Sequence, residues 1–559
     1  MMKLKQAYQK VPMMYRAQIG GRSQLQFISK PDIQRWVSEW TERTYQTPPD
    51  FGVDVRINDI SFNWRLVCNA GQDDGIVRPV IGAKGYPFYP GSSIKGAFSR
   101  ACSPKQKEYY CGKISKNGDL EPGILRFHGG YPIDNSWQKK LLDIVHPQQT
   151  WQVKSNHKDG GAFSQISLYQ PTLRFGISSI INLDESEWKT IWSIWDQAVA
   201  KGLGCRVSAG YGYSNKSKGE VIYRTDLKGE GIAPTLLDKS SEFRPNIFRA
   251  GIRGHALRLF AGLVDDKTTI KLVEQLFGGT QNDGGSVGLL SMSFTTKQLE
   301  LGVFGSGKWA VDTYDVEGRL NWYLTQSLPE EKEKKLKQLI QSLTRFSMIF
   351  GGFGKSWRRA DHDIFYEEYY DGKKQKPLIG CHWQWTGKRP LIYDVKVRKL
   401  EQVTTFINDV HTIAKEWIKL QGLTINNNQY ADSWREAWHP DNVQVWGRIA
   451  DSTEDSQAIA WLHKPYRKGD AKYNIPEGSI YQSSITGKMS QIGRLWHRMY
   501  PLVRLVKDPD NHKKPLGKPT AKYIELLTIF PDNSQQCQQF LDYLNTSSTD
   551  FQLLYPSQV

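Results

Sequence analysis

Residues 85–101 read GYPFYPGSSIKGAFSRA, a turn rich in glycine, proline and serine that leads into a predicted helix. Its small residues allow tight turns with exposed N–H groups, and its hydroxyls and cations add donors where a helix begins, a favourable place for a phosphate oxygen. The residues predicted to contact phosphates here are Gly91, Ser92, Ser93, Lys95 and Arg100. The alternative is a simple capping turn, in which Ser92 or Ser93 satisfies the first helical amides.

A second stretch repeats this arrangement. Residues 243–264 read FRPNIFRAGIRGHALRLFAGLV, with Ile-Arg-Gly at 252–254 placed before a helix as Ile-Lys-Gly is at 94–96. Arg249 and Arg253 supply its cations. Because both stretches place an isoleucine, a cation and a glycine before a helix, they predict an internal duplication.

Each half closes with a glycine-rich loop that carries cations and aromatic residues. The loops read GLGCRVSAGYGYS at 202–214 and GGFGKSWRRAD at 351–361. Glycines let a backbone approach closely, cations neutralise phosphates and aromatic rings stack on unpaired bases, which suits single-stranded RNA. The predicted RNA-binding residues of these loops are Arg206, Tyr211, Lys355, Trp357, Arg358 and Arg359. Tyr211 and Trp357 could equally be core aromatics.

The composition agrees with a polyanion as ligand. The 559 residues predict three or four compact units, and 74 Lys and Arg against 57 Asp and Glu give a formal charge of +17. Because 39% of the residues are hydrophobic, the chain can fold, and the excess charge indicates a binding surface rather than a disordered tail. Nucleic acid is the leading candidate.

Several classes of protein are excluded. No apolar run reaches the length of a membrane helix and the start of the chain lacks the apolar core of a secretory signal, so we expect a cytoplasmic protein without a membrane partner. The six cysteines form no CxxC pair and the histidines show no ligand spacing, so no metal site is predicted. The nearest nucleotide motifs fail at Trp309 and Val207, which replace a required Ser or Thr and a required Gly.

The order of expected elements is typical of an α+β fold. Helical periodicity is strong at 185–200, 330–350 and 401–421, and alternating segments between them predict strands. Strand, helix and strand in this order, with split pairing, indicate ferredoxin-like units. The expected division is an N-terminal extension at 1–50, a first domain at 51–225, a second at 226–400, and a C-terminal α+β extension, or continuation of the second domain, at 401–559.

The paired glycine motifs closely resemble those of the RAMP superfamily, the backbone proteins of CRISPR effectors. With GILRFHGGYP at 123–132 and LDIVHPQQ at 142–149, the first unit is similar to the terminal backbone subunit of Cmr-type type III complexes. The second unit is similar to the other Cmr-type capping subunit. The resemblance covers about residues 50–400. It implies tandem ferredoxin-like (RRM-like) RAMP domains, fused in one chain and followed by the C-terminal extension.

The resemblance also implies a function. Such subunits hold crRNA without a cofactor and help to present it to target RNA, beside other type III effector subunits. In relatives that cut target RNA, an Asp in the loop before the glycine motif acts with a divalent metal, magnesium or manganese. Here Val77 aligns best with that position, Asp73 and Asp74 lie just upstream, and Asp238 lies in the corresponding loop of the second unit. An endoribonuclease acting on target RNA or precursor crRNA is therefore the alternative function, although Asp238 could instead cap a helix or pair with Arg244.

Overall fold

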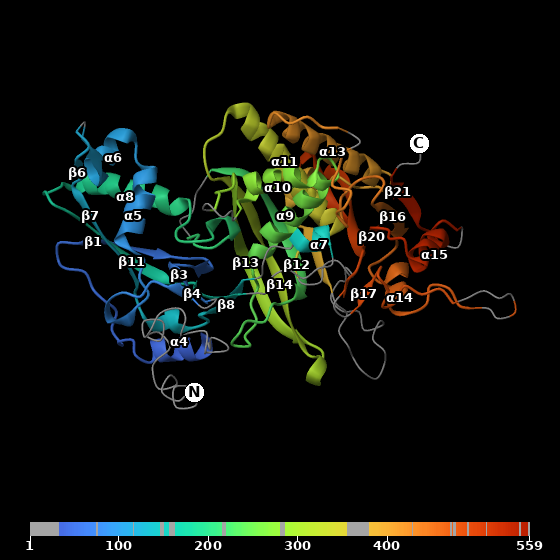
Figure 1. The fold of residues 1–559 in the computed structure, drawn as a ribbon, viewed down its shortest axis with the longest axis horizontal. Coiled ribbons are helices and arrows are strands. Elements are labelled where there is room, and N and C mark those ends of the chain that lie inside the picture. The colour runs from blue at the N-terminus through green and yellow to red at the C-terminus, as the bar shows by residue number, and fades with distance from the viewer. Residues whose placement is uncertain are drawn as a thin grey trace.

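The computed structural model describes the chain from Ile33 onward and divides it into three units of sheet and helix. The described residues are 33–559, apart from 74–75, 116, 146–149, 156–162, 215–219, 280–284, 355–379, 427–428, 470–471, 473–476, 489–490, 510, 547–548 and 557–559. In Figure 1 the units lie side by side in chain order, from blue at the N-terminus to red at the C-terminus. The mixed α+β class predicted from the sequence is confirmed.

The first unit is built on a three-stranded antiparallel sheet in the order β1-β11-β7. Its main elements are β1 (Arg56–Ser61), α5 (Gly91–Ala101), β7 (Leu125–Pro132), β11 (Thr172–Ser179) and α8 (Glu185–Ala200). Asp184 caps α8, and the apolar residues Trp188, Ile191 and Trp195 face the core. After α8 the chain returns beside β1, where Phe62 and Ser214 form a single antiparallel bridge.

Shorter elements surround this sheet. They are α4 (Ile33–Thr41), β2 (Arg65–Leu66), β3 (Asn69–Asp73), β4 (Ile76–Pro79), α6 (Pro104–Cys111), β5 (Gly112–Ile114), β6 (Leu120–Pro122), β8 (Leu142–Val145), α7 (Thr150–Lys154), β9 (Phe163–Ile166), β10 (Leu168–Tyr169) and 3-10 turns at Ala83–Gly85, Asn135–Gln138 and Val207–Ala209. A second sheet has the order β3-β4-β9-β8 and ends beside the second unit.

The second unit has a four-stranded antiparallel sheet in the order β13-β14-β12-β15. Its elements are β12 (Val221–Ile232), α9 (Asn246–Ala261), α10 (Asp266–Phe277), β13 (Leu290–Phe304), β14 (Val311–Leu324), α11 (Glu330–Phe350) and β15 (Cys381–Trp385), with a 3-10 turn at Gly307–Trp309. Apart from the added α10, the chain order is strand, helix, strand, strand, helix, strand. Strands β13 and β14 extend as a long hairpin below the helices (Figure 1).

The C-terminal residues repeat this order in a third sheet, β19-β20-β16-β21. Its elements are β16 (Gln444–Ala450), α14 (Gln457–His463), β19 (Leu495–Asp508), β20 (Asn511–Ile529), α15 (Gln535–Leu544) and β21 (Gln552–Tyr555). Helices α12 (Lys388–Tyr393) and α13 (Gln402–Leu420) connect it to the second unit, and β17 (Gly487–Lys488) pairs with β18 (Gln491–Ile492). The segment predicted as a C-terminal extension therefore contains its own sheet with the strand order of the second unit.

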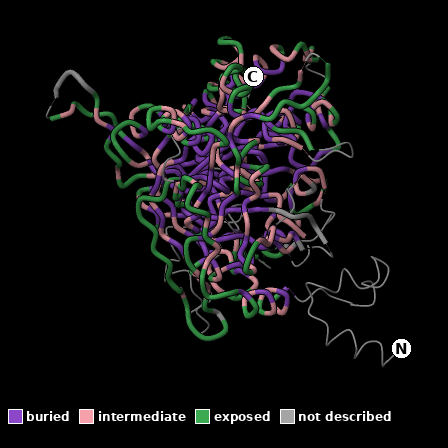
Figure 2. The backbone as a smooth tube through the Cα atoms, turned by 90° about the vertical axis from the view of Figure 1, so that its left-hand side faces the viewer, coloured by how far each residue is buried: buried purple, intermediate pink, exposed green. Residues whose placement is uncertain are grey.

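The second and third units share a hydrophobic core, which one residue of the first unit enters. One hydrophobic cluster runs through the second and third units and contains both Trp383 and Trp496. Val153, on α7 of the first unit, is fully buried in that same cluster. Figure 2 shows the buried residues gathered inside and the exposed ones on outer loops. Among the helices of the described residues, none has both the length and the apolar character to cross a membrane.

Candidate nucleic-acid interface

Helix α5 presents its polar residues to solvent. Ile94, Ala97 and Phe98 are buried on its inner face. The predicted phosphate-contacting residues Ser92, Ser93, Lys95 and Arg100 are exposed. The residue that precedes the helix is Pro90, and no side chain caps the first amides, so the serines do not form the capping turn considered as the alternative. Within the described residues, no ion pair involves Lys95 or Arg100.

Gly91 allows this helix to begin directly against strand β7. A Cβ atom at Gly91 would lie 2.0 Å from the carbonyl oxygen of Phe127, a backbone atom that cannot turn aside. A Cβ atom at Gly96, in the same helix, would meet only the end of the Arg100 side chain, at 3.6 Å. The glycine at position 91 therefore sets how closely the exposed donors of α5 lie to the sheet.

We expect Gly91→Ala to destabilise the protein by about 1–3 kcal/mol, because the helix start must move away from β7. Gly96→Ala is the matched control: alanine favours a helix interior over glycine by about 1 kcal/mol, so stability should be unchanged or raised. Urea unfolding of both variants measures the difference. Equal stability of the two variants would show that the approach of α5 to Phe127 is not tight.

The glycine-rich loop at 202–214 folds back on itself. Gly212 has φ +69° and its Cβ atom would lie 1.8 Å from the carbonyl oxygen of Leu203, so only glycine fits there. The amide of Leu203 donates to the carbonyl of Gly212 at 2.9 Å. Tyr211 is 1% exposed and its ring packs on Trp64 with centroids 4.5 Å apart. Tyr211 therefore lies in the interior, as the alternative interpretation stated, and its ring does not face solvent.

A buried polar network joins this loop to the second unit. The hydroxyl of Tyr211 donates to Asp143 at 3.0 Å, and Arg244 pairs with the same carboxylate at 2.6 Å. Arg65 pairs with Glu242 at 2.6 Å, and both side chains are nearly inaccessible. Burial acts to lower the pKa of Arg65, but the hydrogen bonds and charge of Glu242 outweigh it, so the pKa is raised. Two ion pairs from one loop of the second unit therefore fix the first unit in place.

Arg206, Arg249 and Arg253 are brought together at the same junction. Arg206 lies in the glycine-rich loop with φ +61° and donates to Gln165 at 2.7 Å. Arg249 and Arg253 lie four residues apart on α9, Arg253 is 7% exposed, and its guanidinium donates to the hydroxyl of Thr150 at 3.2 Å. Burial, then the charges of Arg253 and Arg206, lower the pKa of Arg249 to about 10. Residues predicted in two separate stretches thus form one cluster of cations, the arginine cluster.

The correspondence between Lys95 and Arg253 holds in sequence only. Lys95 is exposed on α5, whereas Arg253 is buried because α9 packs against α7, α10 and α11. The pKa of Arg253 is lowered by this burial to about 10, with Glu274 acting in the opposite direction. The two cations cannot bind a phosphate in the same way.

The candidate catalytic aspartates that the structure describes lie on different elements. Asp73 is the last residue of β3, Asp74 falls outside the described residues, and Asp238 is exposed in the loop before α9. The carboxylate of Asp238 accepts hydrogen bonds from the amide and hydroxyl of Ser240, at 3.0 and 2.6 Å. It neither caps a helix nor pairs with Arg244, whose partner is Asp143. Among the residues that can be described, no three His, Cys, Asp or Glu side chains are grouped to hold a metal.

Most of the second glycine-rich loop cannot be assessed. Lys355, Trp357, Arg358 and Arg359 lie outside the described residues, so their roles stay predictions. Sequence reasoning missed the carboxylates that build the junction, Asp143 and Glu242. No local signal marks them, because their partners lie 101 and 177 residues away in the chain.

No family model matches the chain, and no curated protein is similar to it. A chain of a type III-B Cmr-beta complex bound to cognate target RNA is 19% identical, with a TM-score of 0.23 over 29% of this chain and 58% of that one. A chain of a type IV-B CRISPR complex is 18% identical, with a TM-score of 0.20 over 28% and 86%. A further Cmr-beta chain, from the complex with cognate target RNA, AMPPnP and ssDNA, is 11% identical, with a TM-score of 0.28 over 58% and 99%.

Proposed function

We propose that this protein is a crRNA-binding backbone subunit of a type III CRISPR effector ribonucleoprotein, holding guide RNA and helping to present it to target RNA. The second and third units support the proposal, since their chain order and strand order are those of a ferredoxin-like domain. The first unit follows the same order through its second helix. The chain would then contain three such units, one more than the sequence motifs indicate.

The outer face of α5 carries the proposal. Two hydroxyls and two cations face solvent on this helix, which begins against β7. Within the described residues, neither cation forms an ion pair. Such donors on a rigid element suit the phosphate backbone of a nucleic acid and carry no sequence preference. A subunit that holds guide RNAs with different spacer sequences needs contacts of this kind, because they do not depend on the bases.

Binding, rather than cleavage, is the function that these residues support. The carboxylate of Asp238 is engaged in its own turn, and the described residues contain no group of three His, Cys, Asp or Glu side chains that could hold a metal ion. A nuclease would need a group that positions the attacking oxygen and stabilises charge on the leaving one. The described residues near α5 supply cations and hydroxyls for holding a phosphate.

We expect Lys95→Glu and Arg100→Glu each to weaken binding of a repeat-derived RNA about tenfold, because each variant replaces a phosphate contact by repulsion. Fluorescence anisotropy at a series of salt concentrations should also show the slope of log Kd against log salt falling by about one unit per cation. The matched control is Lys337→Glu, the same change on the exposed face of α11. Unchanged affinity and slope in both α5 variants would refute the proposal.

A further inference from the structure

We propose that the β19–β20 hairpin of the third unit is a second contact site for the phosphate backbone of RNA, separate from α5. It rests on the proposed function for the identity of the nucleic acid. On this hairpin, Arg504 of β19 and Lys518 of β20 are directly opposite each other in the antiparallel register, and both are exposed. Side chains at opposite positions point to the same face of a strand pair, so the two cations are neighbours.

The two cations lie on the face of the hairpin that points away from α12. A Cβ atom at Gly517 would lie 2.6 Å from the side chain of Leu391 on α12, so that helix covers the face to which Gly517 belongs. Because successive residues of a strand point to opposite faces, Lys518 and its partner Arg504 are on the other face. A strand of RNA can therefore reach both cations from solvent.

The chain supplies no counter-ion to this pair. Like charges directly opposite each other destabilise a strand pair. Within the described residues, neither Arg504 nor Lys518 forms an ion pair or a side-chain hydrogen bond. The single carboxylate of β19, Asp508, lies four positions beyond Arg504 and 3.9 Å from Lys388 of α12. The hairpin therefore retains a repulsion that a bound anion would remove.

The corresponding hairpin of the second unit shows how such a pair is compensated. There the like charges are carboxylates, since Glu300 and Asp315 are directly opposite each other. Lys228 of the neighbouring strand β12 lies 3.4 Å from Asp315, so the counter-ion comes from within the same sheet. On the third unit the charges have the opposite sign, and an anion from outside the chain would take the place that Lys228 has in the second.

The surroundings of the cations suit a nucleotide. Just after α12, the guanidinium of Arg398 donates to the carbonyl of Val503 at 3.0 Å, which fixes the backbone beside Arg504. Next along the same face, Val506 is 40% exposed and lies opposite Leu516. Two cations beside an apolar surface match the charged phosphate of a nucleotide and the apolar faces of its sugar and base, without reading its sequence.

The experiment compares the full chain with Arg504→Gln and Lys518→Gln, and with Lys522→Gln as the matched control. Lys522 is an exposed cation of the same strand, but Asp451 already pairs with it at 2.8 Å. We expect each hairpin variant to weaken RNA binding about fivefold and to lower the slope of log Kd against log salt by about 0.7–1 unit. Each should also raise Tm by about 1 °C, because the repulsion is removed. The control should change the affinity by less than about twofold.

Two titrations followed by fluorescence anisotropy identify the RNA strand. The first uses a labelled, repeat-derived guide RNA alone. The second adds a labelled complementary target RNA to protein that already holds unlabelled guide. Weaker binding of the hairpin variants in the first titration assigns the site to the guide, and weaker binding in the second alone assigns it to the target.

The outcomes separate this inference from the proposed function. Unchanged affinity in both titrations, or an equal loss in Lys522→Gln, overturns the inference while the effect of the α5 variants on RNA still stands. Cations on an edge strand also prevent pairing with other chains. If that were their only role, the hairpin variants would self-associate in light scattering and keep their affinity for RNA, which is the same contrary result. Weaker binding in the hairpin variants but not in the α5 variants supports this site and overturns the role proposed for α5.

Discussion

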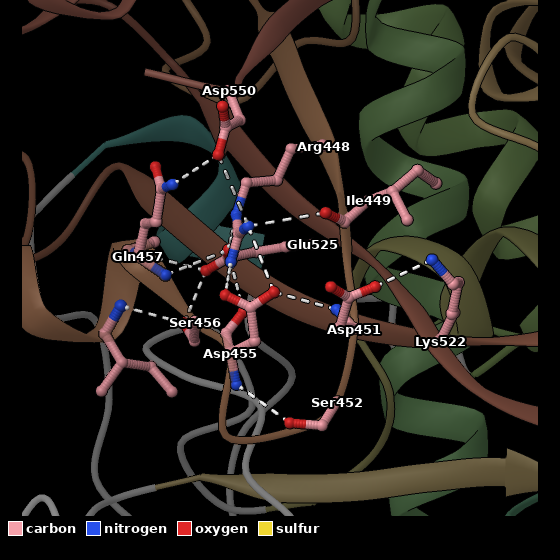
Figure 3. A network of polar contacts seen from close by, with 12 residues as sticks. Arg448, Ile449, Asp451, Ser452, Asp455, Ser456, Gln457, Lys522, Glu525 and Asp550 are labelled. Atoms are coloured by element: carbon pink, nitrogen blue, oxygen red, sulfur yellow. Dashed lines mark hydrogen bonds and ion pairs between the residues drawn. The ribbon is translucent and has the colours of Figure 1, made fainter. Parts of the chain in front are cut away.

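Replacing Glu525 by glutamine should lower the free energy of unfolding by about 3–5 kcal/mol, because it removes the counter-charge of a buried arginine and turns one of the two acceptor oxygens into a donor NH2 group. Glu525 is fully buried on β20 and pairs with Arg448 at 2.6 Å. It also accepts a hydrogen bond from the Ser456 hydroxyl (Figure 3). The ring of His497 lies 3.0 Å from the same carboxylate. Urea unfolding, followed by tryptophan fluorescence, measures the loss.

The control lies in the same network. Asp451 pairs with Lys522 at 2.8 Å, but both side chains are exposed (Figure 3). Asp451→Asn should therefore change stability by no more than about 0.5–1 kcal/mol. If Glu525→Gln cost as little as Asp451→Asn, the network around Arg448 would not hold the third unit together.

Because of the buried carboxylate of Glu525, we expect the free energy of unfolding to depend on pH. Burial acts to raise the pKa of Glu525, but the hydrogen bond from His497 and the charges of His497 and Arg448 outweigh it, and the pKa is lowered. A lowered pKa in the folded state contributes stability above the unfolded value, near 4.3, that is lost as pH falls through the folded value. In Glu525→Gln, which has no carboxyl group at this position, the free energy of unfolding should therefore fall less steeply as the pH is lowered.

Glu242→Gln should produce the second large effect, a loss of about 3 kcal/mol together with weaker RNA binding. Its carboxylate accepts from both Arg65 and the indole N–H of Trp64, which lie in the first unit. The variant would leave Arg65 buried without its counter-ion and loosen the junction beside the arginine cluster. Chemical unfolding and RNA titration of the same preparation measure the two effects.

A double-mutant cycle makes this prediction specific. Adding Arg65→Met to Glu242→Leu removes both charges, so the pair should recover much of the stability lost by either change alone. Glu121→Gln is the control, because Glu121 pairs with Lys113 at 3.1 Å on the surface and both are about half exposed. Additive losses in the cycle would show that Arg65 and Glu242 do not act as a pair.

The helices of this fold are largely predictable from sequence. The expected segments at 185–200 and 330–350 match α8 and α11, and the segment at 401–421 matches α13 within a residue at each end. Their apolar residues recur with helical spacing over several turns, so the signal lies within each segment and needs no distant contact. The failed nucleotide motif around Trp309 begins in the last residues of β13 and continues through the turn of the β13–β14 hairpin, where Gly305 and Gly307 have positive φ.

The candidate site is less predictable because it depends on long-range contacts. Sequence alone aligned Lys95 with Arg253, but the packing of other helices against α9 buries only Arg253. Tyr211 and Arg206 lie five residues apart in one loop, yet one is in the core and the other joins the arginine cluster. Residues 401–559 were predicted as an α+β extension or a continuation of the second domain, and no glycine-rich motif marks the sheet that they contain.

The anchoring of α7 has a consequence for how the chain is synthesised. The backbone around Val153 bonds to residues far downstream: Arg435 donates to the carbonyl of Gln152, 283 positions earlier in the chain. At about 5–20 residues per second, a ribosome needs roughly a quarter of a minute to a minute to cover that distance. During that interval α7 can pack on α9, which is made about a hundred residues after it, but the third-unit residues that complete its contacts are not yet present.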